Sequence, residues 1–221
     1  MDYFLVPFLL LLSYFVGNVS PGWWLTRLFG RGDVRSQGSG GTGATNVARA
    51  LGKKWFYIVL SLDMFKAALA VLSPFPVAAL ARAMGATEGI ATAVPPLSLH
   101  VACAAAVVAG HIWPVCLGFR GGKGVGTFIG AWIAAGAVAW PHYWFLPFTL
   151  LGPIVVGLFF LPLKKGAFVA ALCGLTAQPL LLWLLTKDTL ATILAALTAV
   201  GVMFAHRSNL KSAFAKNKPN A

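Results

Sequence analysis

A short cationic loop is the segment with the clearest capacity for chemistry. Residues 119–125 read Phe-Arg-Gly-Gly-Lys-Gly-Val and lie between two long apolar stretches with almost no charge. Glycine can turn successive N–H groups into one concavity, and Arg and Lys add positive charge, so the loop could hold a phosphate. It lacks the spacing and the trailing Ser or Thr of a Walker motif, and taken alone it is more typical of a basic turn at a membrane. The candidate ligands are Arg120, Gly121, Gly122, Lys123 and Gly124.

A second glycine-rich segment, residues 33–49, combines flexible backbone with hydroxyl and amide side chains. Four glycines fall within residues 38–43, and the N–H and hydroxyl groups around them could bind an oxyanion. An ordinary flexible linker followed by a helix cap explains the same pattern equally well. The hydroxyl and amide side chains that follow the first of these glycines are Ser39, Thr42, Thr45 and Asn46.

Histidines and buried charges complete the set of candidates. His206 and Asn209 follow the last apolar segment, three apart on one helical face, so both could contact one ligand, although a boundary histidine is more often an interface residue. His111 could orient the 121–124 loop. Asp63 and Lys66 are spaced to pair across one helical turn inside an apolar segment, either as the floor of a site or, as we favour, in a structural role.

The composition indicates that the chain lies in a membrane. With 59% apolar residues, 10% charged residues and a mean hydropathy of +0.81, the chain of 221 residues cannot present an ordinary wetted surface. The net charge is +12, but the basic residues lie between the apolar segments and not along one polar face. Their placement therefore indicates membrane topology and contact with anionic lipids, not binding of nucleic acid. The three cysteines lack metal-ligand spacing, and we expect neither a metal site nor a cofactor.

The chain is therefore predicted to be an all-α integral membrane protein with one domain over residues 1–221. Seven transmembrane helices are expected, because about 20 apolar residues cross a bilayer. The excess of Lys and Arg around alternate connections places the N-terminus outside and the C-terminus in the cytoplasm, with all three polar clusters on the cytoplasmic face. A short interfacial helix is expected near residues 77–84. The predicted spans are 3–28, 55–72, 95–117, 125–140, 143–163, 166–185 and 189–205.

Together these segments resemble the acyl-phosphate-dependent glycerol-3-phosphate acyltransferases, the bacterial PlsY family. The resemblance extends from the first loop to the tail, with three specific motifs in the family's order. It rests on residues 33–35, 38–40, 43–46, 62–66, 110–114, 118–125 and 206–209.

The resemblance implies an enzyme of the bacterial cytoplasmic (inner) membrane whose active site faces the cytoplasm. It would transfer a fatty acyl group from acyl phosphate to the 1-hydroxyl of glycerol 3-phosphate, giving lysophosphatidic acid and phosphate. The donor is already activated, so no covalent intermediate is required, and neither acyl-CoA nor acyl carrier protein is expected as donor. The implied catalytic residues are His206, Asn209 and Lys123. The implied substrate-binding residues are Ser39, Thr45, Asn46, Arg49, Arg120, Gly121, Gly122, Gly124 and His111.

Two other functions remain open on the sequence. Glycine-rich cationic loops could line the path of an anion channel or phosphate transporter, but the outer halves of the spans offer no matching polar track. A non-catalytic lipid-binding or assembly subunit would leave His206 and Asn209 unexplained.

Overall fold

The computed structural model describes residues 2–86, 95–139 and 166–209, and this part of the chain is helical without strands. Two short 3-10 turns, η1 and η3, lie in the loops. The elements are α1 (Asp2–Asn18), α2 (Pro21–Leu28), η1 (Val34–Ser36), α3 (Ala44–Leu51), α4 (Lys54–Leu72), α5 (Pro74–Ala83), α6 (Leu97–Ile112), η3 (Val115–Leu117), α7 (Val125–Ala139), α9 (Gly166–Thr186) and α10 (Thr189–Ala205).

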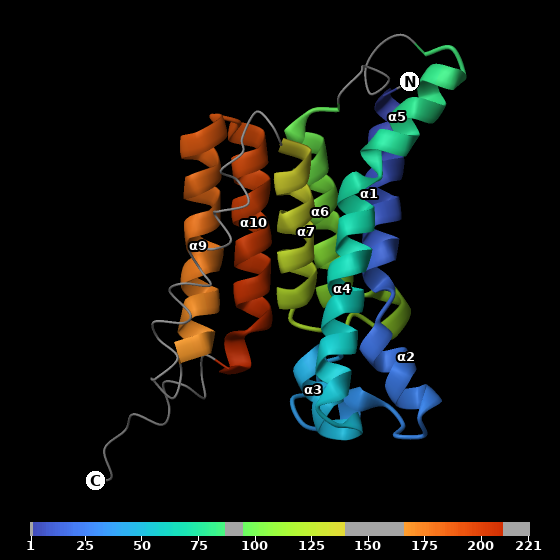
Figure 1. The fold of residues 1–221 in the computed structure, drawn as a ribbon, viewed down its shortest axis with the longest axis vertical. Coiled ribbons are helices and arrows are strands. Elements are labelled where there is room, and N and C mark those ends of the chain that lie inside the picture. Colours follow the sequence, from blue (N-terminus) through green and yellow to red (C-terminus); the bar gives the residue numbers. More distant parts are fainter. Residues whose placement is uncertain (1, 87–94, 140–165, 210–221) are drawn as a thin grey trace.

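The long helices form a bundle with α6 in its interior. Helix α6 packs against α1, α4, α7 and α10, while α4 also packs on α7 and α9 packs on α10. Small and branched residues such as Ala67, Ala104, Val107 and Ala195 fill the contacts between these helices. Helices α2 and α3 lie with the glycine-rich loops at one end of the bundle, and α5 lies at the other (Figure 1). We call the end that carries α2 and α3 the site end.

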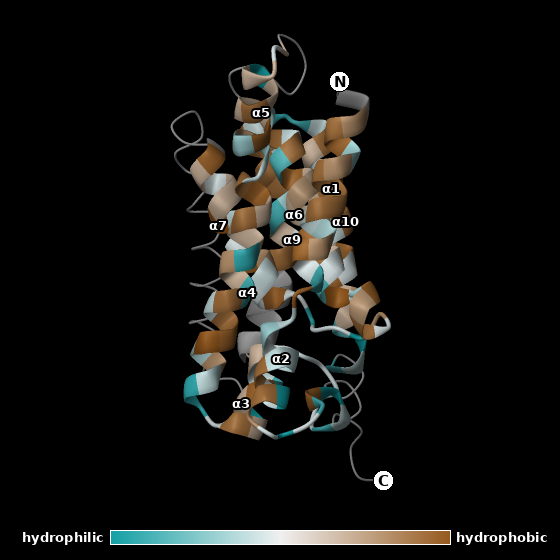
Figure 2. Ribbon diagram, turned by 90° about the vertical axis from the view of Figure 1, so that its right-hand side faces the viewer, coloured by the Kyte–Doolittle hydropathy of each residue, from teal (hydrophilic) through white to brown (hydrophobic). Residues whose placement is uncertain are grey.

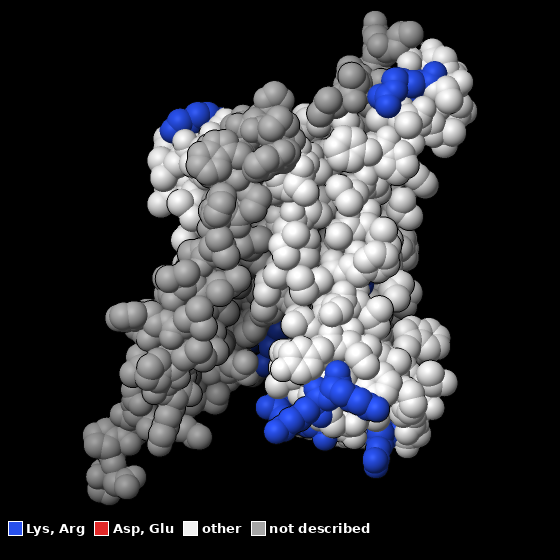
Figure 3. All heavy atoms as spheres, in the orientation of Figure 1, with Lys and Arg blue, Asp and Glu red and all other residues white. Residues whose placement is uncertain are grey.

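The outside of the bundle is apolar over its length. Large apolar side chains such as Phe4, Phe65 and Leu197 are exposed. The ribbon coloured by hydropathy shows mostly apolar residues along the long helices, with polar residues in the loops of the site end and at scattered positions in the bundle (Figure 2). Basic side chains lie chiefly at the two ends in the face shown in Figure 3. The described residues include three helical stretches long and apolar enough to cross a bilayer, namely Phe4–Leu28, Lys54–Ala83 and Leu97–Leu117.

The first predicted span differs from the structure in one respect. Residues 3–28 were expected to form one segment, but α1 ends at Asn18 and α2 begins at Pro21. Proline has no N–H to continue the helix and is well suited to the first turn of the next one. Likewise α6 ends at Ile112, two residues before Pro114. These two interruptions expose backbone groups at the site end.

The remaining helices agree with the predicted segments to within a few residues, with two qualifications. The short helix expected over 77–84 is found as α5, which begins at Pro74. The predicted span 143–163 lies outside the described residues. Two prolines, Pro7 and Pro179, lie inside α1 and α9 without ending either helix.

Helices α1 and α6 approach each other backbone to backbone near the site end. A Cβ atom on Gly17 would collide with the carbonyl of Val107, and one on Gly110 would collide with the carbonyl of Tyr14. Glycine at both positions therefore permits the close crossing, as small residues do between membrane helices. The Tyr14 hydroxyl donates to the Trp113 carbonyl at 2.7 Å, which ties α1 to the end of α6.

Candidate active site

A cavity of about 310 Å³ lies at the site end, where α3, α4, α7 and the end of α10 meet. Both glycine-rich segments contribute to it, so regions far apart in the sequence share one wall. The candidate residues that line it are Ser39, Thr45, Asn46, Arg49, His111, Lys123, Gly124, His206 and Asn209. The lining does not include the other three candidates, Arg120, Gly121 and Gly122.

The first loop is folded around the side chain of Asn46, which is 3% exposed. Its amide nitrogen lies within hydrogen-bond distance of the carbonyls of Val34, Gln37 and Gly41, at 2.9, 3.0 and 2.9 Å. Its amide oxygen accepts from the Ser39 N–H at 3.0 Å. Asn46 thus takes up the backbone groups of the loop and leaves the hydroxyls of the cavity wall to other partners.

The second loop is folded by backbone bonds to the end of α6. The Gly121 N–H donates to the Ile112 carbonyl at 3.2 Å, and the Gly122 N–H donates to the His111 carbonyl at 3.1 Å. These carbonyls lack a partner within their own helix because α6 ends there. The predicted phosphate cradle is therefore not formed by these two N–H groups, which cap the helix instead. Arg120 is exposed and is not part of the cavity lining.

Two cations face the cavity. Lys123 donates from Nζ to Asn209 Oδ1 at 2.7 Å, which joins the second loop to the residues after α10. Burial lowers the pKa of Lys123 from its usual value, and the nearby charge of Arg49 lowers it further. Mutual repulsion of this kind is relieved by an anion between the two groups, so the cavity is electrostatically suited to a phosphate.

His206 stands at the C-terminal end of α10 and is buried. Its Nδ1 lies 2.8 Å from the Val202 carbonyl, an acceptor, so Nδ1 carries a proton and donates it. Burial lowers the pKa of His206, as does Lys123, although the bond to Val202 acts in the opposite direction. The imidazole is consequently neutral near pH 7, and Nε2 has a lone pair that can accept a hydrogen bond.

A buried network of charged side chains adjoins the cavity. Lys66 Nζ is 2.9 Å from Asp63 Oδ1, which confirms the predicted pair, and 3.0 Å from His111 Nδ1. It also donates to the carbonyls of Gly17 at 3.2 Å and Val19 at 2.7 Å, where the break between α1 and α2 frees backbone acceptors. Asp63 also lines the cavity, so its position agrees with the floor of a site, the alternative to the purely structural role that was favoured from the sequence.

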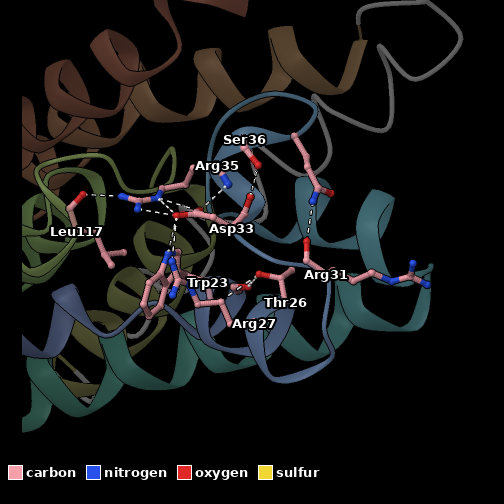
Figure 4. Close-up of polar contacts among 10 residues, drawn as sticks. Trp23, Thr26, Arg27, Arg31, Asp33, Arg35, Ser36 and Leu117 are labelled. Carbon is pink, nitrogen blue, oxygen red and sulfur yellow. Dashed lines mark hydrogen bonds and ion pairs between the residues drawn. The ribbon is translucent and has the colours of Figure 1, made fainter.

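A second ion pair holds the outside of the site end (Figure 4). Arg35 bonds to both oxygens of Asp33 through Nε and Nη2, and its Nη1 donates to the Leu117 carbonyl at 2.6 Å. Trp23 Nε1 donates to the same carboxylate at 3.3 Å. The hydrogen bonds from Arg35 hold the pKa of Asp33 well below its usual range. This pair fastens the first loop to η3, outside the cavity lining.

Some lining residues had no signal in the sequence. Phe56 and Leu60 of α4 supply an apolar wall, and they look like any other residues of a membrane span. Val125 and Gly126 enter because α7 begins at the cavity. An apolar wall beside cationic groups suits a ligand that is part lipid and part anion.

Comparison with known proteins agrees with this geometry. A family model described as glycerol-3-phosphate acyltransferase matches residues 7–216. The chain is 32% identical over 218 residues to glycerol-3-phosphate acyltransferase 1 of Desulfitobacterium hafniense (strain Y51), covering 95% of this chain and 91% of that protein. It is 32% identical over 212 residues to the glycerol-3-phosphate acyltransferase of Clostridioides difficile (strain 630), with 96% and 93% covered.

Solved structures show the same fold. The glycerol 3-phosphate form of PlsY (YgiH), an integral membrane glycerol 3-phosphate acyltransferase, superposes with a TM-score of 0.73 at 26% identity, over 98% of this chain and 95% of that one. Its lysophosphatidic acid form gives a TM-score of 0.69 at 25% identity, over 97% and 94%. The chain therefore belongs to the glycerol-3-phosphate acyltransferase family, the PlsY family of integral membrane acyltransferases of phospholipid biosynthesis.

Proposed function

We propose that this protein transfers a fatty acyl group from acyl phosphate to the 1-hydroxyl of glycerol 3-phosphate. The hydroxyl oxygen forms a bond to the acyl carbonyl carbon, the bond from that carbon to the phosphate oxygen breaks, and the hydroxyl proton leaves on the phosphate. The products are lysophosphatidic acid and inorganic phosphate. Because a mixed anhydride is already activated, positioning and charge stabilisation supply the acceleration, and no protein nucleophile is needed.

The observation that carries this proposal is the composition of the cavity. It combines the cations Arg49 and Lys123 with the hydroxyls of Ser39 and Thr45, and it lies at the end of a bundle whose outer surface is apolar. A soluble dianion can be held by the charges while an acyl chain stays in the lipid.

The roles of the site residues follow from their atoms. Lys123 neutralises charge that develops on the departing phosphate, and Asn209 orients Lys123 through the 2.7 Å bond. Ser39, Thr45 and Arg49 bind the phosphate of the acceptor. His206 accepts the hydroxyl hydrogen at Nε2 and orients the alcohol, while a phosphate oxygen takes the proton. Gly121, Gly122 and His111 act by holding the Lys123 loop, since the N–H groups of the two glycines bond to the carbonyls of Ile112 and His111.

We also propose seven spans in the cytoplasmic (inner) membrane, with the N-terminus outside and the site end in the cytoplasm. Helix α7 begins at the site end and α9 also begins there, so the ends that flank residues 140–165 lie at opposite ends of the bundle (Figure 1). An additional crossing between them is consistent with that placement. Labelling of single cysteines introduced at Lys53 and Arg82 in intact cells tests this topology, which is wrong if both react from the same side.

The reaction itself is tested with purified protein in lipid vesicles. We expect lysophosphatidic acid to form from acyl phosphate and glycerol 3-phosphate, with no product from acyl-CoA or acyl carrier protein, and His206→Ala to abolish it. Turnover with acyl-CoA alone would overturn the donor assignment. Phosphate entry into sealed vesicles without any acyl transfer would favour a transporter.

A further inference from the structure

Asp63 is out of place in a cavity built for an anion. It is the only carboxylate among the described residues that line the cavity, and it shares that wall with Arg49 and Lys123. A negative charge beside a phosphate site opposes phosphate binding unless it is neutralised or has a function of its own.

One oxygen of Asp63 is already engaged. Oδ1 lies 2.9 Å from Lys66 Nζ and 3.3 Å from His111 Nδ1, and this oxygen is buried. Lys66 also bonds to the carbonyls of Gly17 and Val19, so its three hydrogens face four acceptors, counting Asp63 Oδ1 and His111 Nδ1. The carbonyls at the end of α1 hold the ammonium in place, and its charge neutralises that of Asp63.

The second oxygen of Asp63 has no hydrogen bond or ion pair from any described residue. An ionised carboxylate can accept about four hydrogen bonds, so this oxygen retains acceptor capacity in a residue that lines the cavity. Most other polar groups of the wall, including Arg49, Lys123, Ser39 and Thr45, are donors suited to a phosphate. A ligand that also carries hydroxyl groups needs acceptors for their hydrogens.

We propose that Asp63 binds substrate directly, its second carboxylate oxygen accepting a hydrogen bond from a hydroxyl group of a polyol phosphate. This inference rests on the proposed function. It gives the cavity a second acceptor for substrate hydroxyl groups, beside His206, so that Asp63 helps to distinguish a hydroxylated phosphate ester from one that merely carries the same charge. A site built to accept a hydroxyl hydrogen rejects an analogue without it, because the buried acceptor is then left unpaired.

The test compares two ligands of equal charge. n-Propyl phosphate has the three-carbon chain and the dianion of glycerol 3-phosphate but no hydroxyl group. In the wild-type enzyme, we measure the KM for glycerol 3-phosphate and the inhibition constant for n-propyl phosphate, and we repeat both with Asp63→Asn. We expect the KM to rise roughly tenfold or more, as for a lost charge-assisted hydrogen bond, while n-propyl phosphate inhibits equally or more strongly.

Equal weakening of both ligands in Asp63→Asn would overturn the inference, and so would no change in either. Asp33→Asn is the matched control, because Asp33 is also in an ion pair at the site end but does not line the cavity. It should lower thermal stability and leave the ratio of the two constants unchanged.

If Asp63→Asn does not fold because Lys66 loses its partner, the double variant Asp63→Asn/Lys66→Met carries the same measurement without the orphaned charge. The wild-type enzyme offers a check that needs no variant, since n-propyl phosphate binding as tightly as glycerol 3-phosphate also contradicts the inference. Absence of acyl transfer to glycerol 3-phosphate in the wild type would instead refute the proposed function.

Discussion

The two glycine-rich loops of the site end look alike in sequence but are folded by different means. In the first, one buried side chain, Asn46, bonds to the backbone of the loop. In the second, the N–H groups of Gly121 and Gly122 bond to carbonyls at the end of α6. The loops touch where the Thr42 N–H donates to the Gly121 carbonyl at 3.4 Å.

The difference determines what each loop can offer a ligand. The first loop bonds several of its backbone groups to Asn46 and presents the side chain of Ser39, with Thr45 and Arg49 from α3. The second loop has committed two of its N–H groups to the helix and presents chiefly Lys123. Glycine content therefore indicates a tight backbone, and only the hydrogen-bond partners show whether that backbone faces a ligand.

The largest expected effect tests whether the second loop acts through one side chain. Lys123→Ala removes a charge-assisted contact of about 1.5–3 kcal/mol, so kcat/KM should fall roughly ten- to hundred-fold or more. Arg120→Ala is the matched control, since Arg120 is a neighbouring cation outside the cavity lining. Steady-state kinetics at equal expression decide the matter, and equal losses in both variants would mean that the loop acts only through its net charge.

The next effect tests how the second loop is packed. A Cβ atom on Gly122 would fall on Nε2 of the buried ring of His111, so Gly122→Ala should cost about 1–3 kcal/mol of stability and displace Lys123. Gly43→Ala in the first loop has open space around it and a φ of −75°, and it should be tolerated. Thermal midpoints of the two purified variants provide the comparison. A stable, active Gly122→Ala protein would show that the loop can fold without this contact.

A smaller effect tests the first loop. Asn46→Ala leaves buried backbone groups without their partner, which should lower stability by about 1–3 kcal/mol and raise the KM for glycerol 3-phosphate. Ser36→Ala removes one exposed bond of the same segment and should lie within about 0.5 kcal/mol of the wild type. If the thermal midpoints of the two variants agree, the first loop does not depend on Asn46.

The smallest effect uses pH to separate the cations of the two loops. Lys123 has a lowered pKa, so its charge, and with it the activity, should be lost as the pH rises through a value below 10.5. A guanidinium group keeps its charge at such pH values. The alkaline limb of the kcat/KM profile should move to higher pH or vanish in Lys123→Arg. An unchanged limb in that variant would assign it to another group.

Much of the fold could be predicted from the sequence because the lipid bilayer restricts which backbone structures are possible. A bilayer leaves helices as the workable form for long apolar segments, and α4, α7 and α10 begin within one residue of the predicted spans. The break between Asn18 and Pro21 lies inside one apolar run, where proline cannot continue the preceding helix. At this break the carbonyls of Gly17 and Val19 accept hydrogen bonds from Lys66. Those bonds depend on the packing of α1 against α4, which the hydrophobic pattern of either segment alone does not reveal.

The site was predictable in its residue types and less so in its geometry. Charged and hydroxyl side chains at the ends of spans stood out, and most of them do line one cavity. Arg120 is exposed and does not line it. The sequence left two readings of Asp63 open, since a pair that neutralises itself and a pair that also faces a ligand have the same spacing.

The backbone contact between Gly17 and Gly110 has a consequence for how the protein meets bilayers of different thickness. Membrane helices respond to a thickness mismatch by tilting. Two helices that touch backbone to backbone can rotate about that point more easily than they can separate. Because the contact lies next to the cavity, tilting displaces the far ends of α1 and α6 more than the residues beside Lys66. We therefore expect the crossing to act as a pivot, so that changes in lipid chain length disturb the residues beside it less than the far ends of the two helices.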